Sequence, residues 1–329
     1  MNRRLRSALA TLVIALGAVP ALAAPMVYIP LGSGNTVIAV DAATDRITST
    51  YDGVLNPHGL VATPDGEYLI VGSLNETPLP QGAPAETPNS QLYVVHPAHG
   101  HVMSTIPVSG WTHHQAITPD GKLVISTHPT RGSISVTDVN ENRVVRTIKT
   151  GPAPNYALVT GDGKKVYVSN SGNGTISEID ASTWTVVRTL EGGPSPEHLV
   201  MDEGRGRLYV ASGRTGQVSV ISMQSGKLDR SYELGKRLHG LDLGDDGKTL
   251  FITVISDEKL VALDPDTGAI RSRLLSPAPY HLGAVRGTGK LYVSSRKEPK
   301  IWVIDQKTLE LTGSIPLPGG EGHQIGIVR

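Results

Sequence analysis

Six histidines recur at one position of a repeated pattern in this sequence, and they are the side chains best suited to metal chemistry. They are His58, His113, His198, His239, His281 and His323, and the seventh place in the series is taken by Asn155. A neutral imidazole leaves one ring nitrogen as an acceptor, and imidazole is a preferred ligand of copper, zinc, nickel and iron. Brought together, these histidines would form a transition-metal site, and an all-nitrogen site favours copper. Because one ion binds fewer than six such ligands, we expect more than one metal or unequal roles among them.

The histidines have to be positioned by a repeat of about 42 residues,. Each repeat contains short apolar runs, such as residues 166–169 and 208–211, that follow a glycine-containing turn. Runs of Val, Ile, Leu and Tyr of this length are typical of strands, and Asp-Gly supplies the positive φ values of tight hairpins. A period of this length with four short strands is typical of a β-propeller blade.

The number of units predicts an all-β, seven-bladed β-propeller with four antiparallel strands per blade. The last unit begins at His323, and the chain ends at residue 329, so this unit has room for one strand. Residues 27–50 contain three further strand-like runs. One C-terminal and three N-terminal strands would complete a blade and close the ring, which removes exposed sheet edges.

The expected topology places the histidine side chains on one face of the disc. The innermost strand of each blade lines the channel, and its first residue lies beside the loops of one face. We therefore expect the six histidines to converge at one channel mouth, with the Asp-Gly hairpins on the opposite face. His114 should point between blades, because side chains alternate along a strand. We expect His128 and Asn155 to hydrogen-bond the ligands or handle protons, and Arg214 and Arg296 to be auxiliary groups of this face.

Residues 166–180, with Gly193-Pro194, resemble the YVTN repeat of bacterial and archaeal propeller proteins. The resemblance covers nearly the whole chain after its first segment and implies the fold, but propellers of this class serve as enzymes, cofactor holders and adhesion modules. The histidine-lined mouth is similar to the copper-cluster site of the nitrous oxide reductase propeller. That similarity implies the six histidines as copper ligands and an oxidoreductase activity. Asn155 departs from the pattern, and the chain has no cysteine-bearing domain for electron entry.

The sequence leaves two alternative functions open for the histidine face of the disc. Exported propellers that hold haem d1 place histidines against an iron tetrapyrrole, and aromatic and basic residues are available here as its partners: Trp111, Tyr156, Tyr280, Arg214, Lys236, Arg237 and Arg296. A non-enzymatic module would instead bind a protein, a haem-type cofactor or a surface polymer. A small-molecule substrate or a redox partner would accompany the enzyme. A calcium-dependent lactonase on a similar disc would need Glu and Asp at the mouth, where this sequence has histidine.

The first 23 residues have the pattern of a secretory signal peptide. Arg3, Arg4 and Arg6 precede an apolar run at residues 8–19, and small residues precede a cleavage point after Ala23,. The run is shorter than the roughly 20 residues that span a membrane, so we expect cleavage, no membrane span afterwards, and a periplasmic or secreted protein. Without these arginines, acidic residues outnumber basic ones, which argues against nucleic-acid binding. The absence of cysteine excludes disulfides and thiolate ligands,.

Residues 24–329 are expected to form a single propeller domain with one insertion. One repeat is longer than the others by about 13 residues, which fall in a proline-rich segment at residues 74–90. This segment follows a second strand and is therefore expected on the histidine face. It would either cover the site as a lid or be a tolerated surface insertion.

Overall fold

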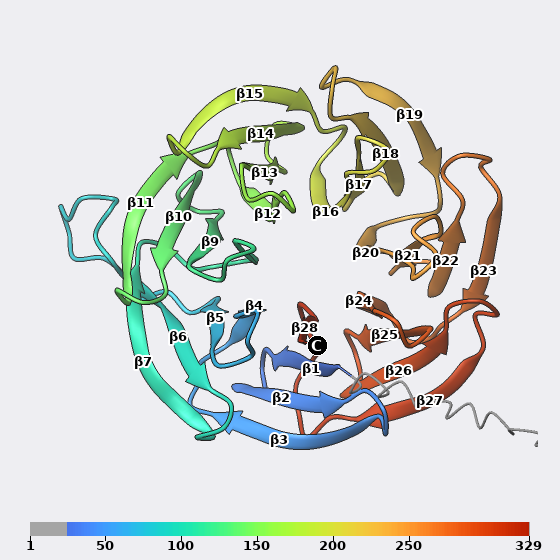
Figure 1. Cartoon of the computed structure of the whole chain (residues 1–329), viewed down its shortest axis with the longest axis horizontal. Coiled ribbons are helices and arrows are strands. Elements are labelled where there is room, and N and C mark those ends of the chain that lie inside the picture. Colours follow the sequence, from blue (N-terminus) through green and yellow to red (C-terminus); the bar gives the residue numbers. More distant parts are fainter. Residues whose placement is uncertain (1–24, 329) are drawn as a thin grey trace, which may run out of the picture.

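The protein is a disc of seven four-stranded antiparallel sheets arranged around a central channel (Figure 1). The computed structural model describes residues 25–328, and the predicted signal peptide at residues 1–23 lies outside this part. Strands and turns make up these residues, with no helix among them. Residues 25–328 consequently contain no helix of the length and apolarity needed to cross a membrane. The predicted all-β fold with seven blades is confirmed.

The strands of each blade follow one another in sequence from the channel to the rim, except in the blade that closes the ring. Blades 1 to 3 consist of β4 (Pro57–Ala62), β5 (Leu69–Ser73), β6 (Ser90–His96), β7 (His101–Val108); β8 (Gln115–Ile117), β9 (Leu123–His128), β10 (Ser133–Asp138), β11 (Arg143–Lys149); and β12 (Pro154–Val159), β13 (Lys165–Asn170), β14 (Thr175–Asp180), β15 (Thr185–Glu191). Blades 4 to 6 consist of β16 (Pro196–Asp202), β17 (Arg207–Ser212), β18 (Gln217–Ser222), β19 (Leu228–Glu233); β20 (Leu238–Leu243), β21 (Leu250–Val254), β22 (Lys259–Leu263), β23 (Ile270–Leu274); and β24 (Pro279–Val285), β25 (Lys290–Ser295), β26 (Lys300–Asp305), β27 (Leu311–Pro316).

Blade 7 joins the two ends of the described chain. It contains β28 (Gly326–Val328), β1 (Met26–Leu31), β2 (Thr36–Asp41) and β3 (Arg46–Asp52), in this order from the channel outward. β28 pairs with β1 through Met26 and Val328 at one end and Tyr28 and Gly326 at the other. The predicted closure by one C-terminal and three N-terminal strands is confirmed.

The hairpins between the first and second strands have a sequence cause that recurs from blade to blade. In blade 1 the hydroxyl of Thr63 donates a hydrogen bond to Asp65 at 2.5 Å, and the Asp65 carboxylate accepts one from the backbone N–H of Glu67. Gly66 follows with φ of +71°, a conformation that glycine adopts without steric cost,. Equivalent Thr to Asp bonds occur in blades 2 and 3. These turns hold the inner strands in place on the face opposite the histidines.

Apolar side chains between neighbouring blades form the core. Blade 7 packs on blade 6 through residues such as Ile29 and Tyr292, both fully buried, and on blade 1 through residues such as Val37 and Leu60. Full burial of one such side chain contributes about 1.5–3 kcal/mol. Packing between blades therefore fixes the relative positions of the inner strands on which the histidines lie.

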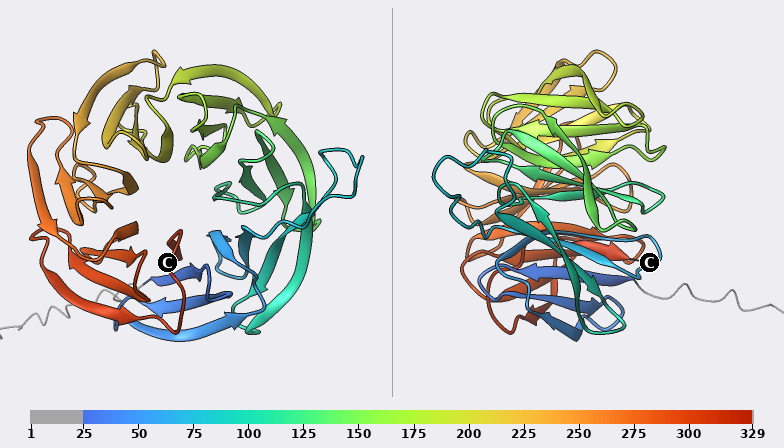
Figure 2. Two further views of the ribbon diagram at one scale, coloured as in Figure 1. Left: turned by 180° about the vertical axis from the view of Figure 1, so that it is seen from behind. Right: turned by 90° about the vertical axis from the view of Figure 1, so that its left-hand side faces the viewer.

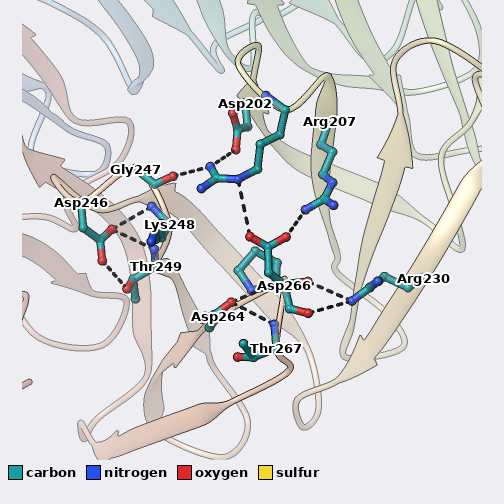
Figure 3. A network of polar contacts seen from close by, with 12 residues as sticks. Asp202, Arg207, Arg230, Asp246, Gly247, Lys248, Thr249, Asp264, Asp266 and Thr267 are labelled. Carbon is teal, nitrogen blue, oxygen red and sulfur yellow. Dashed lines mark hydrogen bonds and ion pairs between the residues drawn. The ribbon is translucent and has the colours of Figure 1, made fainter.

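An arginine-rich network among the turns of the hairpin face links blades 4 and 5 (Figure 3). The carboxylate of Asp266 forms an ion pair with Arg207 at 2.5 Å and lies 3.5 Å from the guanidinium of Arg205. Arg230 donates a hydrogen bond to the backbone carbonyl of Asp266. The Asp266 side chain is 44% exposed. Solvent screening limits each such pair to about 1 kcal/mol or less, so the network orients these turns and adds little to overall stability.

The proline-rich insertion projects outward from the rim of the disc, between β5 and β6 (Figures 1 and 2). Its base is fixed to blade 2, where Arg131 pairs with Glu76 at 2.5 Å, and the hydroxyl of Ser109 donates to the carbonyl of Ala85 at 2.8 Å. Because the loop points away from the channel, it does not cover the channel mouth. The structure thus agrees with a surface insertion and not with a lid.

Candidate metal centre

Irregularities in strand pairing bring the histidines to the channel mouth. In blade 1 the pairing of β4 with β5 is interrupted between Pro57 and Leu60, which leaves His58 in a bulge. The same interruption contains His198 in blade 4, His239 in blade 5 and His281 in blade 6. A bulge re-aims the side chains of the residues in it. Histidines at different positions of their strands can therefore turn toward one point.

His114 occupies the position in blade 2 that His281 occupies in blade 6, and His113 occupies the position that His58 occupies in blade 1. The backbone N–H of His114 donates to the hydroxyl of Thr127, just as that of His281 donates to the hydroxyl of Ser294. His113 lies one residue earlier, and its backbone N–H donates to the carbonyl of Thr127. The expectation that His114 points between blades is wrong, because its fully buried imidazole packs on His113, His58 and His198.

Seven imidazoles form one continuous cluster, which we call the histidine cluster. It consists of the six predicted histidines and His114, that is His58, His113, His114, His198, His239, His281 and His323. The contacting rings have centroids 4.1 to 4.8 Å apart in these pairs, the closest being His58 with His323 and the most separated His114 with His198. Except for the half-buried His113, every member is buried, with at most 8% of its surface exposed.

Three groups within the cluster have the spacing of a metal site. They are His58 with His113 and His114; His58 with His281 and His323; and His114 with His198 and His281. In each group one nitrogen per residue lies within 4.8 Å of the others. Two nitrogens about 2.0–2.1 Å from one ion are at most about 4.2 Å apart, so each ring needs to move by less than about 1 Å. Any two groups share a histidine, so filling both requires that histidine to use both nitrogens.

The carbonyl oxygen of Asn155 orients two of these rings. It accepts hydrogen bonds from Nδ1 of His113 at 3.3 Å and from Nδ1 of His114 at 3.1 Å. A carbonyl only accepts, so both Nδ1 atoms carry the proton, and Nε2 of each neutral ring is left as an acceptor. A hydrogen bond of this type to the far nitrogen is usual for histidines that bind metal. Asn155 thus acts through its backbone, and its buried side-chain oxygen has no partner among the described residues.

The cluster contains more nitrogen acceptors than the protein satisfies. Both ring nitrogens of His58 are buried without a hydrogen bond among residues 25–328, and so are Nε2 of His114 and His198 and Nδ1 of His323. Leaving a buried polar group unpaired costs about 1–3 kcal/mol. A cation bound between the rings would satisfy these atoms.

Burial favours the neutral form of six of these histidines. Desolvation, followed by repulsion from neighbouring histidines, holds the pKa of His58, His114 and His281 well below 6.5. Burial likewise lowers the pKa of His198 and His239 far below 6.5, and that of His113 to about 4. Neutral imidazole is the form that binds metal. At neutral pH these six histidines are therefore ready to bind a cation without losing protons from imidazolium.

Carboxylates and aromatic rings lie at the edge of the cluster. Nε2 of His323 donates to Glu321 at 3.2 Å, which lowers the pKa of that carboxyl to about 2, and Nδ1 of His239 lies 3.6 Å from Glu197. The ring of Tyr280 stacks on His239 at 4.1 Å, and the guanidinium of Arg296 lies 5.0 Å above Tyr280. The sequence analysis did not identify the two glutamates. Their positions beside His198 and His323 in the sequence were the available signal.

The remaining predicted residues do not join the cluster. Nδ1 of the buried His128 donates to the carbonyl of Gly110 at 3.1 Å, and its Nε2 bonds Ser135 Oγ at 2.8 Å, so both nitrogens are used elsewhere. Burial lowers the pKa of His128 to about 4. Arg214 lines a groove of about 800 Å³ between blades 3 and 4, together with Glu191 and Ser195. Arg296 lies over the ring of Tyr280, which stacks on His239, and belongs to none of the three groups.

The sequence of residues 115–256 matches the family described as SMP-30/Gluconolactonase/LRE-like region. No curated protein matches the chain significantly. The YVTN repeat and the nitrous oxide reductase propeller, both named above as resemblances, stay predictions.

Solved structures similar to the chain share its propeller fold. Hydrazine synthase of Kuenenia stuttgartiensis has 19% identity and a TM-score of 0.73 over 91% of this chain and 100% of that one. A putative 6-phosphogluconolactonase of Bacteroides uniformis has 15% identity and a TM-score of 0.76 over 93% and 100%. The dihydro-heme d1 dehydrogenase NirN in complex with DHE has 15% identity and a TM-score of 0.67 over 94% and 68%. At these identities the likeness shows a propeller fold that is shared by proteins of different chemistry.

Proposed function

We propose that this protein binds a transition-metal ion through the histidine cluster. The observation that supports this most directly is the set of buried ring nitrogens without a partner, arranged in three groups that an ion can bridge. His58, His114 and His281 each belong to two groups and would hold the ion, and the carbonyl of Asn155 would keep the rings of His113 and His114 in the binding tautomer. The surrounding blades bury all of these rings except the half-buried His113.

Copper is the metal that we propose, with an oxidoreductase role. The three groups offer imidazole nitrogen without a carboxylate or a thiolate, and nitrogen ligands suit copper,. Bound copper would supply one-electron redox chemistry. Calcium does not fit, because it requires six to eight oxygen ligands, and the two carboxylates at the edge are already bonded to, or lie beside, histidines.

A tetrapyrrole fits the described geometry less well than an ion. The imidazoles contact one another directly, with centroids as close as 4.1 Å, and leave no slot for a planar macrocycle between them. A haem-type cofactor would have to lie outside the cluster, against Tyr280 and Trp111, and would not satisfy the buried nitrogens of His58.

Metal stoichiometry tests the proposal. The untagged protein is purified, dialysed against a mild chelator and titrated with Cu²⁺ and Zn²⁺, with the bound metal measured by elemental analysis. We expect at least one copper per chain, and its loss in the double variant His58→Ala/His281→Ala, which removes a ligand from all three groups. The matched control His96→Ala/His99→Ala removes two stacked histidines of an outer turn on the opposite face and should retain the metal.

Two outcomes would overturn the proposal. A folded wild-type protein that takes up neither metal would leave the histidines as channel lining. Equal metal loss in both double variants would show that binding is adventitious. Either result would favour a non-enzymatic binding module, for which the groove of about 800 Å³ beside Arg214 is the first surface to test.

We also propose export to the periplasm or beyond, supported by the signal-peptide pattern of residues 1–23,. The mass of the protein recovered from the periplasmic fraction should correspond to a chain that begins at Ala24. A chain that starts at Met1 and stays with the cytosolic fraction would contradict export.

A further inference from the structure

A cavity of about 280 Å³ extends from the histidine cluster along the central channel. His198 and His281 lie at one end of it, and Arg286, in the turn after β24, lies at the other. The inner strands start at the histidine face and end at the face of the Asp-Gly hairpins. The cavity therefore leads from the cluster toward the hairpin face and has room for about nine water molecules at ~30 Å³ each,.

The walls of the cavity combine apolar and polar side chains and offer no unpaired charge. Leu, Val, Ile and Met side chains from five blades line it. The carboxylate of Asp242 forms an ion pair with Arg286 at 2.6 Å and also accepts hydrogen bonds from the backbone N–H groups of Leu243 and Ala284. The two charges of this lining therefore neutralise each other. An ion that entered would lose hydration without a free opposite charge among these side chains. An uncharged ligand is favoured.

Tyr156 supplies a free polar group beside the cluster. Its ring lies 4.7 Å from that of His114 and 4.9 Å from that of His198, and the residue lines the cavity. Within the described part of the chain its hydroxyl takes part in no hydrogen bond, although a phenol is both donor and acceptor. A ligand with an acceptor oxygen or nitrogen would satisfy this donor while it lies against the histidines.

We infer that this part of the channel is a ligand chamber for a small uncharged molecule with a hydrogen-bond acceptor, which reaches His198 and His281 from the hairpin face. The inference rests on the proposed function, because the ligand would meet the metal there. Tyr156 is the side chain that would hold it. The histidine mouth, by contrast, has Glu197, Glu321 and Arg296 at its edge.

Chemical modification of the metal-free protein tests the route without relying on metal binding. Diethyl pyrocarbonate is small, uncharged and carbonyl-bearing, and it acylates neutral imidazole; the rates at His198 and His281 are measured by peptide mass spectrometry. Leu158 lies two residues after Tyr156 on β12 and lines the cavity nearer the hairpin face. In Leu158→Trp we expect both rates to fall at least tenfold.

The matched control narrows the opposite mouth. Lys297 is exposed in the turn between β25 and β26 and lines a cavity of about 220 Å³ with Arg296 and Glu321. Lys297→Trp should leave the rates at His198 and His281 unchanged. Slower modification in Lys297→Trp but not in Leu158→Trp, or wild-type rates in both, would overturn the inference. If Leu158→Trp loses its strand circular dichroism, Ile327→Trp on the facing strand β28 replaces it.

A second pair of reagents tests whether the cavity prefers an uncharged ligand over an anion. Iodoacetamide and iodoacetate have nearly the same size and differ in charge, and the chain has no cysteine to compete for them. We expect alkylation of His198 and His281 by the neutral reagent at a rate at least tenfold above that of the anion. Equal rates would contradict an uncharged ligand. If the protein binds no metal but its histidines are modified as expected here, only the metal proposal is overturned and the ligand chamber stands.

Discussion

Nε2 of His239 and Nε2 of His281 face each other at 3.2 Å, in adjacent blades of the ring. Two neutral imidazoles can share this contact only if one of them donates a proton. Nδ1 of His239 lies near Glu197, which favours the tautomer with its proton on Nδ1 and makes His281 the donor. A metal ion bound by His281 through this nitrogen has to displace that proton to Nδ1 of the same ring.

The two residues of this pair should differ in their effect on metal affinity. His281 belongs to two of the three ligand groups and His239 to none. We expect His281→Ala to weaken copper binding by more than 100-fold and His239→Ala by about 10- to 100-fold, as for the loss of an outer partner. Competition with a chelator of known affinity measures both. An equal loss in the two variants would show that His239 is itself a ligand.

His114→Ala should weaken copper binding as strongly as His281→Ala, because His114 also belongs to two groups. His128→Ala is the control, since both nitrogens of His128 are bonded to Gly110 and Ser135 outside the cluster. Its copper affinity should stay within about threefold of wild type, although the protein should lose about 1–3 kcal/mol of stability from its broken hydrogen bonds. Tight copper binding by His114→Ala would remove this residue from the proposed site.

Asn155→Ala should leave copper affinity nearly unchanged. The atom that orients His113 and His114 is the backbone carbonyl, which alanine retains. The side-chain oxygen of Asn155 is buried without a partner among the described residues, so its removal should not lower the free energy of unfolding,. Equilibrium denaturation and chelator competition check the two statements. A loss of affinity above tenfold would assign the side chain a direct role.

The stability of the metal-free protein should fall as the pH decreases below about 6.5. Burial lowers the pKa of His58, His114, His198 and His281 in the folded state, so the unfolded chain binds more protons in this range. Their contribution is present above pH 6.5 and is lost as the pH falls toward about 4, the pKa of His113. Each such histidine adds about 1.4 kcal/mol per pH unit to the slope.

Denaturation in urea between pH 7.5 and 5 measures this slope. The double variant His58→Ala/His281→Ala should have a smaller slope, because two buried histidines are gone. Glu197 opposes the effect in part, because its carboxylate favours the protonated forms of His198 and His113. A free energy of unfolding that is constant over this range would contradict the neutral state of the cluster.

Removal of residues 326–329 should destabilise the ring. β28 would be lost, and β1 would expose the edge that now pairs with it at Met26, Val27 and Tyr28. We expect a loss of about 3 kcal/mol and a melting temperature lower by roughly 6–12 °C, with a tendency to aggregate. Shortening the insertion by residues 80–84 is the control and should shift the melting temperature by about 2 °C or less. Equal effects of the two deletions would contradict closure by β28.

Blade number and closure could be predicted from the sequence because propeller blades are local structures. Each blade except the closing one is a continuous stretch, and its hairpins are encoded by neighbouring residues such as Thr63, Asp65 and Gly66. The spacing of such stretches gives their number. The outward direction of the insertion could not be predicted from the sequence. It depends on contacts such as that of Arg131 with Glu76, two residues that are 55 positions apart in the chain.

The histidine site was predictable only at the level of the face on which it lies. The repeat position of His58, His239 and the others places them at the start of inner strands, and the closed ring makes those starts converge. The place of His114 and the orientation of its ring were not predictable, because a bulge of one residue changes the side to which a histidine points.

The sequence by itself determined the seven-bladed disc and the concentration of histidines at one end of its channel, since both follow from local strand and turn signals repeated at a regular interval. Only the tertiary structure decided which nitrogens lie within 4.8 Å of one another, which carbonyl holds His113 and His114, and where the channel opens beside His198 and His281. Those features depend on contacts between blades, where shifts of a few ångströms separate a ligand group from a set of packed rings.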